Sequence, residues 1–324
     1  MTIKNTIPFF FTLLLLASCK LKSQENKKNK FKNITIQKID NAVLASGELY
    51  RIDSFPSKNI KPRPVDIWLP ENYTSEKTYA VLYMHDGQNL FDATTTWNKQ
   101  EWMIDEVASQ LMNENKTRDF IVIGIHNIPQ IRFLDLYPEK TFNYIPDKKL
   151  DSLELAAKKN GITLKQFTGD EYLKFIVNEL KPFIDTTYSV KADKENTFIA
   201  GSSMGGLMSW YAISEYPKIF GGAACLSTHW VGLTPSASNP LPDAIFKYLK
   251  KNAPEQDTHK LYFDYGNKTL DQLYPQYASR VDTIFLEKGY TTKNFKNLFF
   301  DGTDHSEKSW QKRVHIPITF LLKK

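Results

Sequence analysis

Short apolar runs alternate with amphipathic segments of helical length from residue 33 onward, and this alternation restricts the fold more than any other feature. Runs such as Tyr79–Met84 and Phe120–Ile125 contain no charged residue, as is typical of parallel strands buried on both faces. Strands and helices that follow one another in turn predict an α/β fold, with a mostly parallel sheet and helices on both faces. The first strands have short connections, which predicts an antiparallel edge.

The predicted strands span residues 34–39, 63–69, 79–84, 120–125, 197–200, 222–226, 260–263 and 297–300. The predicted helices span residues 102–113, 172–184, 207–216, 242–250, 270–288 and 306–313. Between them, residues 129–169 carry Pro138, Pro146 and Gly161 and show little periodicity, so we expect a lid-like insertion there.

Residues 1–18 have the pattern of an export signal. Lys4 precedes an apolar run, Ile7–Ala17, that is long enough for a signal peptide and too short to span a bilayer. The run leads into Leu16-Ala17-Ser18-Cys19, which resembles a bacterial lipobox and implies that Cys19 carries a lipid; the alternative is an ordinary cleaved signal peptide. Lys20 after the cysteine favours the outer membrane. We therefore expect an exported protein, anchored in the cell envelope and facing the periplasm or the surface.

Residues 19–32 are expected to form a charged, flexible tether, and residues 33–324 one domain. The chain has a formal charge of +6, and residues 1–32 account for it with seven lysines and one acid, Glu25. Basic and acidic residues balance in the rest of the chain, so no nucleic-acid partner is indicated. Cys225 is the only cysteine besides Cys19, which excludes a disulfide framework in the mature chain.

A serine stands where a catalytic nucleophile is expected. Gly201-Ser202-Ser203-Met204-Gly205 fits G-x-S-x-G, after the predicted strand 197–200 and before the predicted helix 207–216. The motif needs its glycines because a sharp turn from strand to helix crowds the backbone around the serine. We predict Ser203 as the nucleophile and the backbone N–H of Met204 as an oxyanion donor.

A base and an acid are expected later in the chain. His305 lies in a turn-rich segment after the last predicted strand, which is the position of the histidine in this order of elements. The loop after the predicted strand 260–263 offers two carboxylates, Asp264 and Asp271. We prefer Asp271, because it lies beyond the turn at Gly266 whereas Asp264 can still belong to the strand. Asp264 is kept as the alternative acid.

The segment His85-Asp86-Gly87-Gln88-Asn89 follows the predicted strand 79–84 and is expected to complete the oxyanion hole. Gly87 allows the backbone to approach a substrate, and the Gln88 N–H is the predicted donor; the alternative is a polar turn that only ends the strand. Four residues near other predicted strand ends are candidate substrate contacts, and each also suits a packing or surface position: His229, Trp230, Trp97 and Arg132.

Metal and nucleotide sites have no support in the sequence. The six histidines are scattered, and neither H-E-x-x-H nor a paired-cysteine spacing occurs, so no metal is predicted. The glycine patterns that bind dinucleotides or nucleoside triphosphates are also absent, so no cofactor is predicted.

The chain resembles the Putative esterase family, which includes enterochelin esterases, S-formylglutathione hydrolase, mycolyltransferases and the acetylxylan and feruloyl carbohydrate esterases. The segments that carry the resemblance are residues 85–92, 198–206 and 305–310, and a further match runs from Gly169-Asp170-Glu171-Tyr172 to Asp185. Together they extend from about Tyr50 to Leu322.

This resemblance implies an α/β-hydrolase fold and hydrolysis of carboxylic esters without a cofactor, with Ser203 as nucleophile and His305 as base. It leaves the acid open, because relatives often place the aspartate three residues after the glycine whereas Asp271 is five after Gly266. The expected substrate is a small-molecule or glycan ester, such as an acetyl or feruloyl carbohydrate ester or a siderophore ester. Two alternatives are an acyltransferase that uses the same serine and a non-catalytic, lipid-anchored binding protein.

Overall fold

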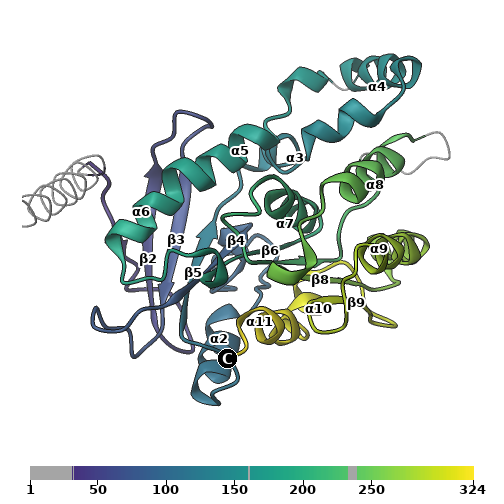
Figure 1. Ribbon diagram of the computed structural model, residues 1–324. Helices are drawn as coiled ribbons and strands as arrows, with labels where there is room; N and C mark the ends of the chain where they lie inside the picture. Colours follow the sequence, from purple (N-terminus) through teal and green to yellow (C-terminus); the bar gives the residue numbers. More distant parts are fainter. Residues whose placement is uncertain (1–30, 32, 160, 233–238) are drawn as a thin grey trace, which may run out of the picture.

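A computed structural model describes residues 31, 33–159, 161–232 and 239–324 of the chain. Its centre is a nine-stranded sheet in the order β1-β2-β3-β5-β4-β6-β7-β8-β9 (Figure 1). Strands β4 to β9 are parallel, whereas β1, β2 and β3 form an antiparallel edge and β3 runs antiparallel to β5. The predicted α/β fold and its antiparallel edge are therefore confirmed. The predicted export signal, Cys19 and the tether apart from Phe31 lie outside the described residues.

The strand bounds are β1 Gln37–Lys38, β2 Glu48–Phe55, β3 Arg63–Leu69, β4 Ala80–His85, β5 Phe120–Ile125, β6 Thr197–Ser202, β7 Gly222–Leu226, β8 Lys260–Tyr265 and β9 Phe295–Phe299. The predicted bounds of β3, β5 and β7 match these. The predicted strand 34–39 is too long, because only two of its residues pair with β2. Strand β2 was not predicted, because charged and polar residues interrupt its apolar positions and it lies near the exposed edge.

The helices are α2 Ile104–Asn113, α3 Arg132–Asp135, α4 Asp147–Lys159, α5 Gly169–Phe175, α6 Lys181–Thr187, α7 Met204–Glu215, α8 Leu241–Asn252, α9 Pro275–Glu287, α10 Glu307–Gln311 and α11 His315–Leu322. A π-helical turn, Ile176–Leu180, joins α5 to α6. The predicted helix 270–288 is divided into a 3₁₀ turn, Thr269–Leu273, and α9, because Pro275 at the start of α9 favours a helix beginning there. Helices α4 and α11 were not predicted.

Two apolar layers cover the sheet, one on each face. Alternate residues of β4 divide between them: Val81 and Tyr83 pack with α5 to α9, and Leu82 and Met84 pack with α2 and α11. Figure 1 shows α2 and α11 together on one side of the sheet and α5, α6 and α7 on the other. Within the described residues, no helix combines the length and the apolar composition that a membrane crossing requires.

The order of the strands determines where the functional loops meet. Strand β4 lies between β5 and β6, and the chain leaves β4 for β5 on one side and returns to β6 on the other. In an open α/β sheet, ligands bind at such a reversal, beyond the carboxyl ends of the strands. The segments that follow β4, β6, β8 and β9 carry Gln88, Ser203, Met204, Asp271 and His305, whereas the alternative acid Asp264 lies within β8.

Candidate active site

Ser203 lies at a strained turn between β6 and α7. Its backbone has φ +57° and ψ −120°, a conformation that residues other than glycine rarely adopt. Two backbone hydrogen bonds hold it there: the Ser203 N–H donates to the Leu226 carbonyl at 3.0 Å, and the His229 N–H donates to the Ser203 carbonyl at 3.1 Å. The turn is therefore fixed by the end of β7 and the loop after it, and Ser203 is 9% exposed at the carboxyl end of the parallel strands.

The two glycines of the motif allow this turn to close. A Cβ on Gly201 would lie 2.9 Å from the Gly205 carbonyl carbon and 3.0 Å from the His85 Cδ2. A Cβ on Gly205 would lie 3.1 Å from the His85 Cβ. The backbone before and after Ser203 thus packs against itself and against the end of β4, at a spacing that a side chain would obstruct.

His305 is paired with Asp271. The His305 Nδ1 lies 2.6 Å from the Asp271 Oδ1, and the Gly266 N–H donates to Oδ2 of the same carboxylate at 2.7 Å. Asp271 is fully buried, in the 3₁₀ turn after β8, and His305 lies in the loop between β9 and α10. The His305 N–H also donates to the Thr269 Oγ1 at 2.9 Å, which attaches its loop to the turn that carries the aspartate.

The alternative acid, Asp264, has a different partner. It lies within β8, where the guanidinium of Arg313 donates to both of its carboxylate oxygens, from Nη2 at 3.0 Å and from Nε at 3.1 Å. Asp264 is 2% exposed and Arg313 is 3% exposed, so the two form a buried ion pair. The structure therefore brings Asp271, and not Asp264, to His305.

A cavity of about 620 Å³ opens beside these groups. Ser203 and His305 both line it, and so does Gln88 from the loop after β4. Three tryptophans also line it, Trp97, Trp102 and Trp310, of which Trp97 is the exposed one. The predicted nucleophile and base thus share one cavity with an exposed aromatic ring.

The predicted oxyanion residues differ in their positions. Met204 is the first residue of α7, and the first N–H groups of a helix have no partner within the helix. Gln88 lines the cavity, and its Oε1 accepts from the Asn127 N–H at 3.2 Å. Gly87 allows the loop to pack on β5, because a Cβ there would lie 2.4 Å from the Gly124 carbonyl carbon.

Two of the predicted substrate contacts, Trp97 and Arg132, lie on the cavity wall. The side chain of Trp97 is 84% exposed, which leaves most of its ring surface open to a ligand. Arg132 donates to both carboxylate oxygens of Asp86, from Nε at 2.8 Å and from Nη2 at 2.7 Å. This pairing keeps the pKa of Asp86 below its usual value although burial opposes ionisation.

The other two predicted contacts, His229 and Trp230, lie in packed surroundings. The His229 Nδ1 is 2.9 Å from the Tyr274 hydroxyl, and burial, with a smaller effect of His305, lowers the pKa of His229 to about 4. Trp230 is 4% exposed and stacks between Trp210 and Phe246 in the core. Its prediction as a substrate contact is corrected: the chain turns inward after β7, and the indole fills the layer under α8.

Two groups of residues at the site were missed by sequence reasoning. Glu307 lines the cavity and accepts from the Asn98 Nδ2 at 2.9 Å, beside Trp97. Ser227 and Arg313 lie beneath the His305–Asp271 pair, where Ser227 Oγ donates to Asp271 at 2.7 Å. Their only signal in the sequence is their proximity to predicted strand ends or to His305.

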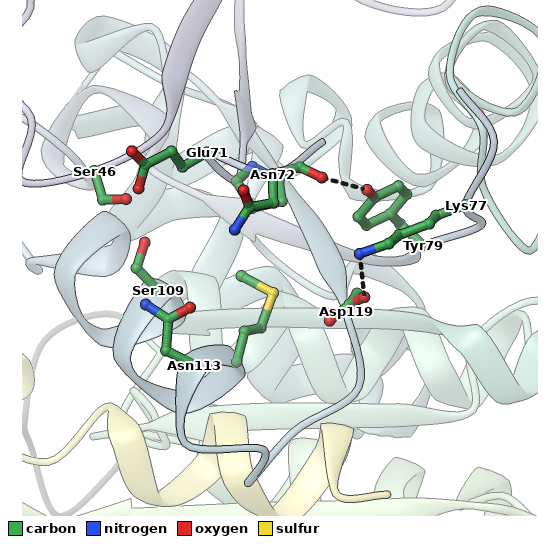
Figure 2. Close-up of a pocket in the computed structure, with 10 residues that line it drawn as sticks. Ser46, Glu71, Asn72, Lys77, Tyr79, Ser109, Asn113 and Asp119 are labelled. Carbon is green, nitrogen blue, oxygen red and sulfur yellow. Dashed lines mark hydrogen bonds and ion pairs between the residues drawn. The ribbon is translucent and has the colours of Figure 1, made fainter. Parts of the chain in front are cut away.

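Neither a metal cluster nor the small cavity at the amino ends of β4 and β5 offers another candidate centre. No group of three or more metal-ligating side chains lies together in the described part of the chain. A smaller cavity, of about 90 Å³, lies at the amino ends of β4 and β5, where the Tyr79 hydroxyl donates to the Asn72 carbonyl and Lys77 lies 4.0 Å from Asp119 (Figure 2). Ser203 and His305 lie at the carboxyl ends of the parallel strands, so this cavity is at the opposite ends of those strands.

Comparisons of sequence identify a family model and several relatives. The family model described as Putative esterase matches residues 59–315. The chain is 24% identical over 192 residues to an endo-1,4-beta-xylanase/feruloyl esterase from Xylanibacter ruminicola, across 56% of this chain. It spans only 22% of that protein's length, and 58% of the length of an uncharacterised Bacillus subtilis relative to which it is 25% identical over 170 residues.

Comparisons of structure agree on the fold. A ferulic acid esterase superposes with a TM-score of 0.60 at 16% identity, over 86% of this chain and 99% of that one. An enterobactin esterase from Shigella flexneri superposes with a TM-score of 0.59 at 13% identity, over 86% of this chain and 60% of that one. The fold is therefore the α/β-hydrolase fold.

Proposed function

This chain belongs to the Putative esterase family, and on that premise we propose that it hydrolyses carboxylic esters through an acyl-enzyme intermediate on Ser203. One observation carries the proposal. Ser203, at its strained turn, and His305, hydrogen bonded to the buried Asp271, line the same cavity. A nucleophile, a base and a group that orients the base are the parts that covalent acyl transfer requires.

In the proposed first step, Nε2 of His305 takes the proton of the Ser203 hydroxyl while the oxygen attacks the ester carbonyl carbon. The carbonyl oxygen becomes an oxyanion, and the N–H groups of Met204 and Gln88 stabilise its charge. The intermediate then expels the alcohol oxygen, which receives the proton from His305, and the acyl group stays on Ser203. Asp271 stabilises the imidazolium that exists between these two proton transfers.

In the second step, water replaces the alcohol. His305 takes a proton from the water as its oxygen attacks the acyl carbon, and a second oxyanion forms in the same place. When this intermediate collapses, the bond to Ser203 breaks, the serine oxygen recovers a proton from His305, and the carboxylic acid leaves. No cofactor takes part in either step.

The proposed substrate is an ester of a carbohydrate or of a siderophore, with an aromatic or acetyl acid. The exposed ring of Trp97 offers a flat surface on which an aromatic acid or a sugar can stack. Asn98 and Glu307, which are hydrogen bonded to each other beside it, offer amide and carboxylate groups suited to hydroxyls. The relatives and structural neighbours named as feruloyl and enterobactin esterases support this choice of substrates.

A panel of esters tests the proposed function on the domain from residue 33 onward. We expect hydrolysis of p-nitrophenyl acetate and, with a higher kcat/KM, of at least one of methyl ferulate, feruloylated or acetylated xylan and ferric enterobactin. Trp97→Ala should raise KM for that preferred substrate by up to about 10-fold, because it removes one stacking surface, and change the acetate little. Leu286→Ala, an exposed apolar residue on α9, is the matched control and should change neither.

The panel also separates the alternatives. Equal effects of Trp97→Ala on every ester would contradict a stacking role for that ring. If no ester turns over although a fluorophosphonate labels Ser203, the acyl group must pass to an acceptor other than water. If Ser203 does not label either, the proposed esterase activity is wrong and a binding role takes its place.

We also propose that Cys19 anchors the domain to a membrane of the cell envelope, with residues 20–32 as the tether. The support is the apolar run before Leu16-Ala17-Ser18-Cys19 and the charged segment after it. In bacteria fed an alkyne-labelled fatty acid, the full chain should carry the label and sediment with membranes. Cys19→Ser should lose the label. Labelling of the Cys19→Ser variant, or unlabelled full chain, would contradict the anchor.

A further inference from the structure

Ser227 lies directly under the carboxylate that is paired with His305. It follows β7, it is fully buried, and its backbone has a positive φ of 41°. Its Oγ is 2.7 Å from Asp271 Oδ2, 3.0 Å from the Trp310 Nε1 and 2.9 Å from the Arg313 Nη2. One hydroxyl therefore contacts three side chains that come from the last third of the chain.

The chemistry of these partners determines where the hydroxyl proton points. An indole N–H and a guanidinium N–H can only donate hydrogen bonds. A serine hydroxyl has two acceptor lone pairs and a single proton. Trp310 and Arg313 therefore occupy both lone pairs of the Ser227 oxygen, and its proton is directed to Asp271. No other arrangement satisfies all three contacts.

The ion pair of Arg313 with Asp264 supports this arrangement. Asp264 accepts from Nε and Nη2 of the Arg313 guanidinium, and its Oδ1 also accepts from the Ser227 backbone N–H at 3.0 Å. The same carboxylate therefore fixes the backbone of Ser227 and the cation that contacts its side chain. This assigns a structural purpose to Asp264, the aspartate that does not reach His305.

We propose that Ser227, held by Trp310 and Arg313, is a positioning residue for ester hydrolysis, which fixes the Asp271 carboxylate so that its Oδ1 faces the His305 Nδ1. Asp271 Oδ2 accepts from Ser227 and from the Gly266 N–H, both at 2.7 Å, which leaves Oδ1 for His305 at 2.6 Å. Two donors on one oxygen prevent rotation of the carboxylate. The proposal rests on the proposed function, because Ser227 acts through Asp271 and His305 and does not touch the ester.

Charge strengthens the effect of this contact. Hydrogen bonds to an ionised carboxylate stabilise it more than bonds between neutral groups do. The Ser227 hydroxyl receives a bond from the Arg313 cation, which polarises its O–H toward Asp271. The titratable groups that face Asp271 are His305, Arg313 and Tyr274. Without the hydroxyl, the negative charge of Asp271 would be shared with fewer donors and would stabilise the His305 imidazolium more strongly.

The test compares three variants. Ser227→Ala removes the hydroxyl, and Ser227→Gly removes it while suiting the positive φ better than any other residue. Thr228→Val is the matched control, because the neighbouring buried hydroxyl bonds to the Cys225 carbonyl at 3.1 Å and not to Asp271. In both Ser227 variants we expect kcat to fall roughly 10- to 100-fold with little change in KM, and the acid limb of the kcat/KM profile to move to higher pH. Thr228→Val should leave these unchanged.

A spectroscopic readout makes the test independent of turnover. The His305 Nδ1 proton, which is hydrogen bonded to Asp271, should give a downfield ¹H resonance in the wild-type protein, assigned by its absence in His305→Ala. We expect this resonance to shift in both Ser227 variants and not in Thr228→Val. If the wild-type protein hydrolyses no ester, the proposed function fails, and the resonance still decides whether Ser227 positions Asp271.

Three outcomes would overturn the proposal. The first is wild-type kcat, an unmoved acid limb and an unshifted resonance in Ser227→Ala and Ser227→Gly. The second is loss of cooperative thermal unfolding in both variants, which would make Ser227 a residue that the fold itself requires. Activity lost in Ser227→Ala but retained in Ser227→Gly would likewise contradict it, because both lack the hydroxyl.

Discussion

Ser203→Ala is expected to lower kcat for ester hydrolysis by roughly 10⁴- to 10⁶-fold and to leave the fold intact. The reason is that Ser203 is the proposed site of the covalent acyl group, and alanine offers no oxygen to attack the carbonyl. The side chain is small and lies at the cavity, so its loss leaves no large void in the core. The measurement is the initial rate with p-nitrophenyl acetate, alongside a thermal unfolding curve.

Ser202→Ala is the matched control for this variant. Ser202 is the last residue of β6, it precedes Ser203 directly, and it lines the same cavity. Only Ser203 has the strained backbone of the turn. We expect Ser202→Ala to keep most of the activity and its labelling by a fluorophosphonate, whereas Ser203→Ala loses both. The proposed nucleophile would be wrong if Ser203→Ala kept wild-type turnover, or if the label were found on Ser202.

Asp271→Asn should lower kcat by roughly 10³- to 10⁴-fold with a smaller change in KM. An asparagine amide has nearly the same shape, but it has no charge with which to stabilise the His305 imidazolium. If its NH₂ group faces His305, it also favours the tautomer in which Nδ1 accepts, so Nε2 carries a proton and cannot serve as the base. The measurement is kcat over a range of pH for the purified variant.

Asp264→Asn is the contrasting variant, because Asp264 is paired with Arg313 whereas Asp271 is paired with His305. This change leaves the Arg313 cation buried with a neutral neighbour, so its main effect should be a lower free energy of unfolding, by about 3 kcal/mol or more. Its kcat should fall less than that of Asp271→Asn, in the fraction that stays folded. A greater loss of kcat in Asp264→Asn than in Asp271→Asn would transfer the acid role to Asp264.

Much of the fold was predictable from the sequence because buried parallel strands have a simple pattern. Strands β5 and β7 are unbroken apolar runs, and their predicted bounds agree with the structure. Strand β2 was missed because it pairs near the edge, where polar residues such as Arg51 and Asp53 are tolerated. Helix α11 was missed because its apolar residues show no clear face and Pro317 lies within it.

The candidate site was predictable where a local motif describes it and not where distant residues meet. Ser203 was predicted as the nucleophile from five residues and the order of strand and helix around them. The preference between Asp264 and Asp271 rested on a turn at Gly266, because the sequence alone cannot show that Arg313, 49 residues later, pairs with Asp264. Trp230 was assigned to the substrate for a similar reason: an aromatic residue after a strand suits both a cavity and a core.

The strand order has a consequence for the kinetics of folding. The groups proposed to act on the ester follow β4, β6, β8 and β9, so Gln88 and His305 are more than 200 residues apart in the chain. Among the parallel pairs, β4 and β6 are the most distant in sequence, with Val81 opposite Thr197, and closing so long a stretch of chain slows this pairing. A nascent chain that ends before β9 lacks His305 altogether. The proposed activity therefore requires the chain through the loop after β9, and a chain that ends before this loop is expected to be inert.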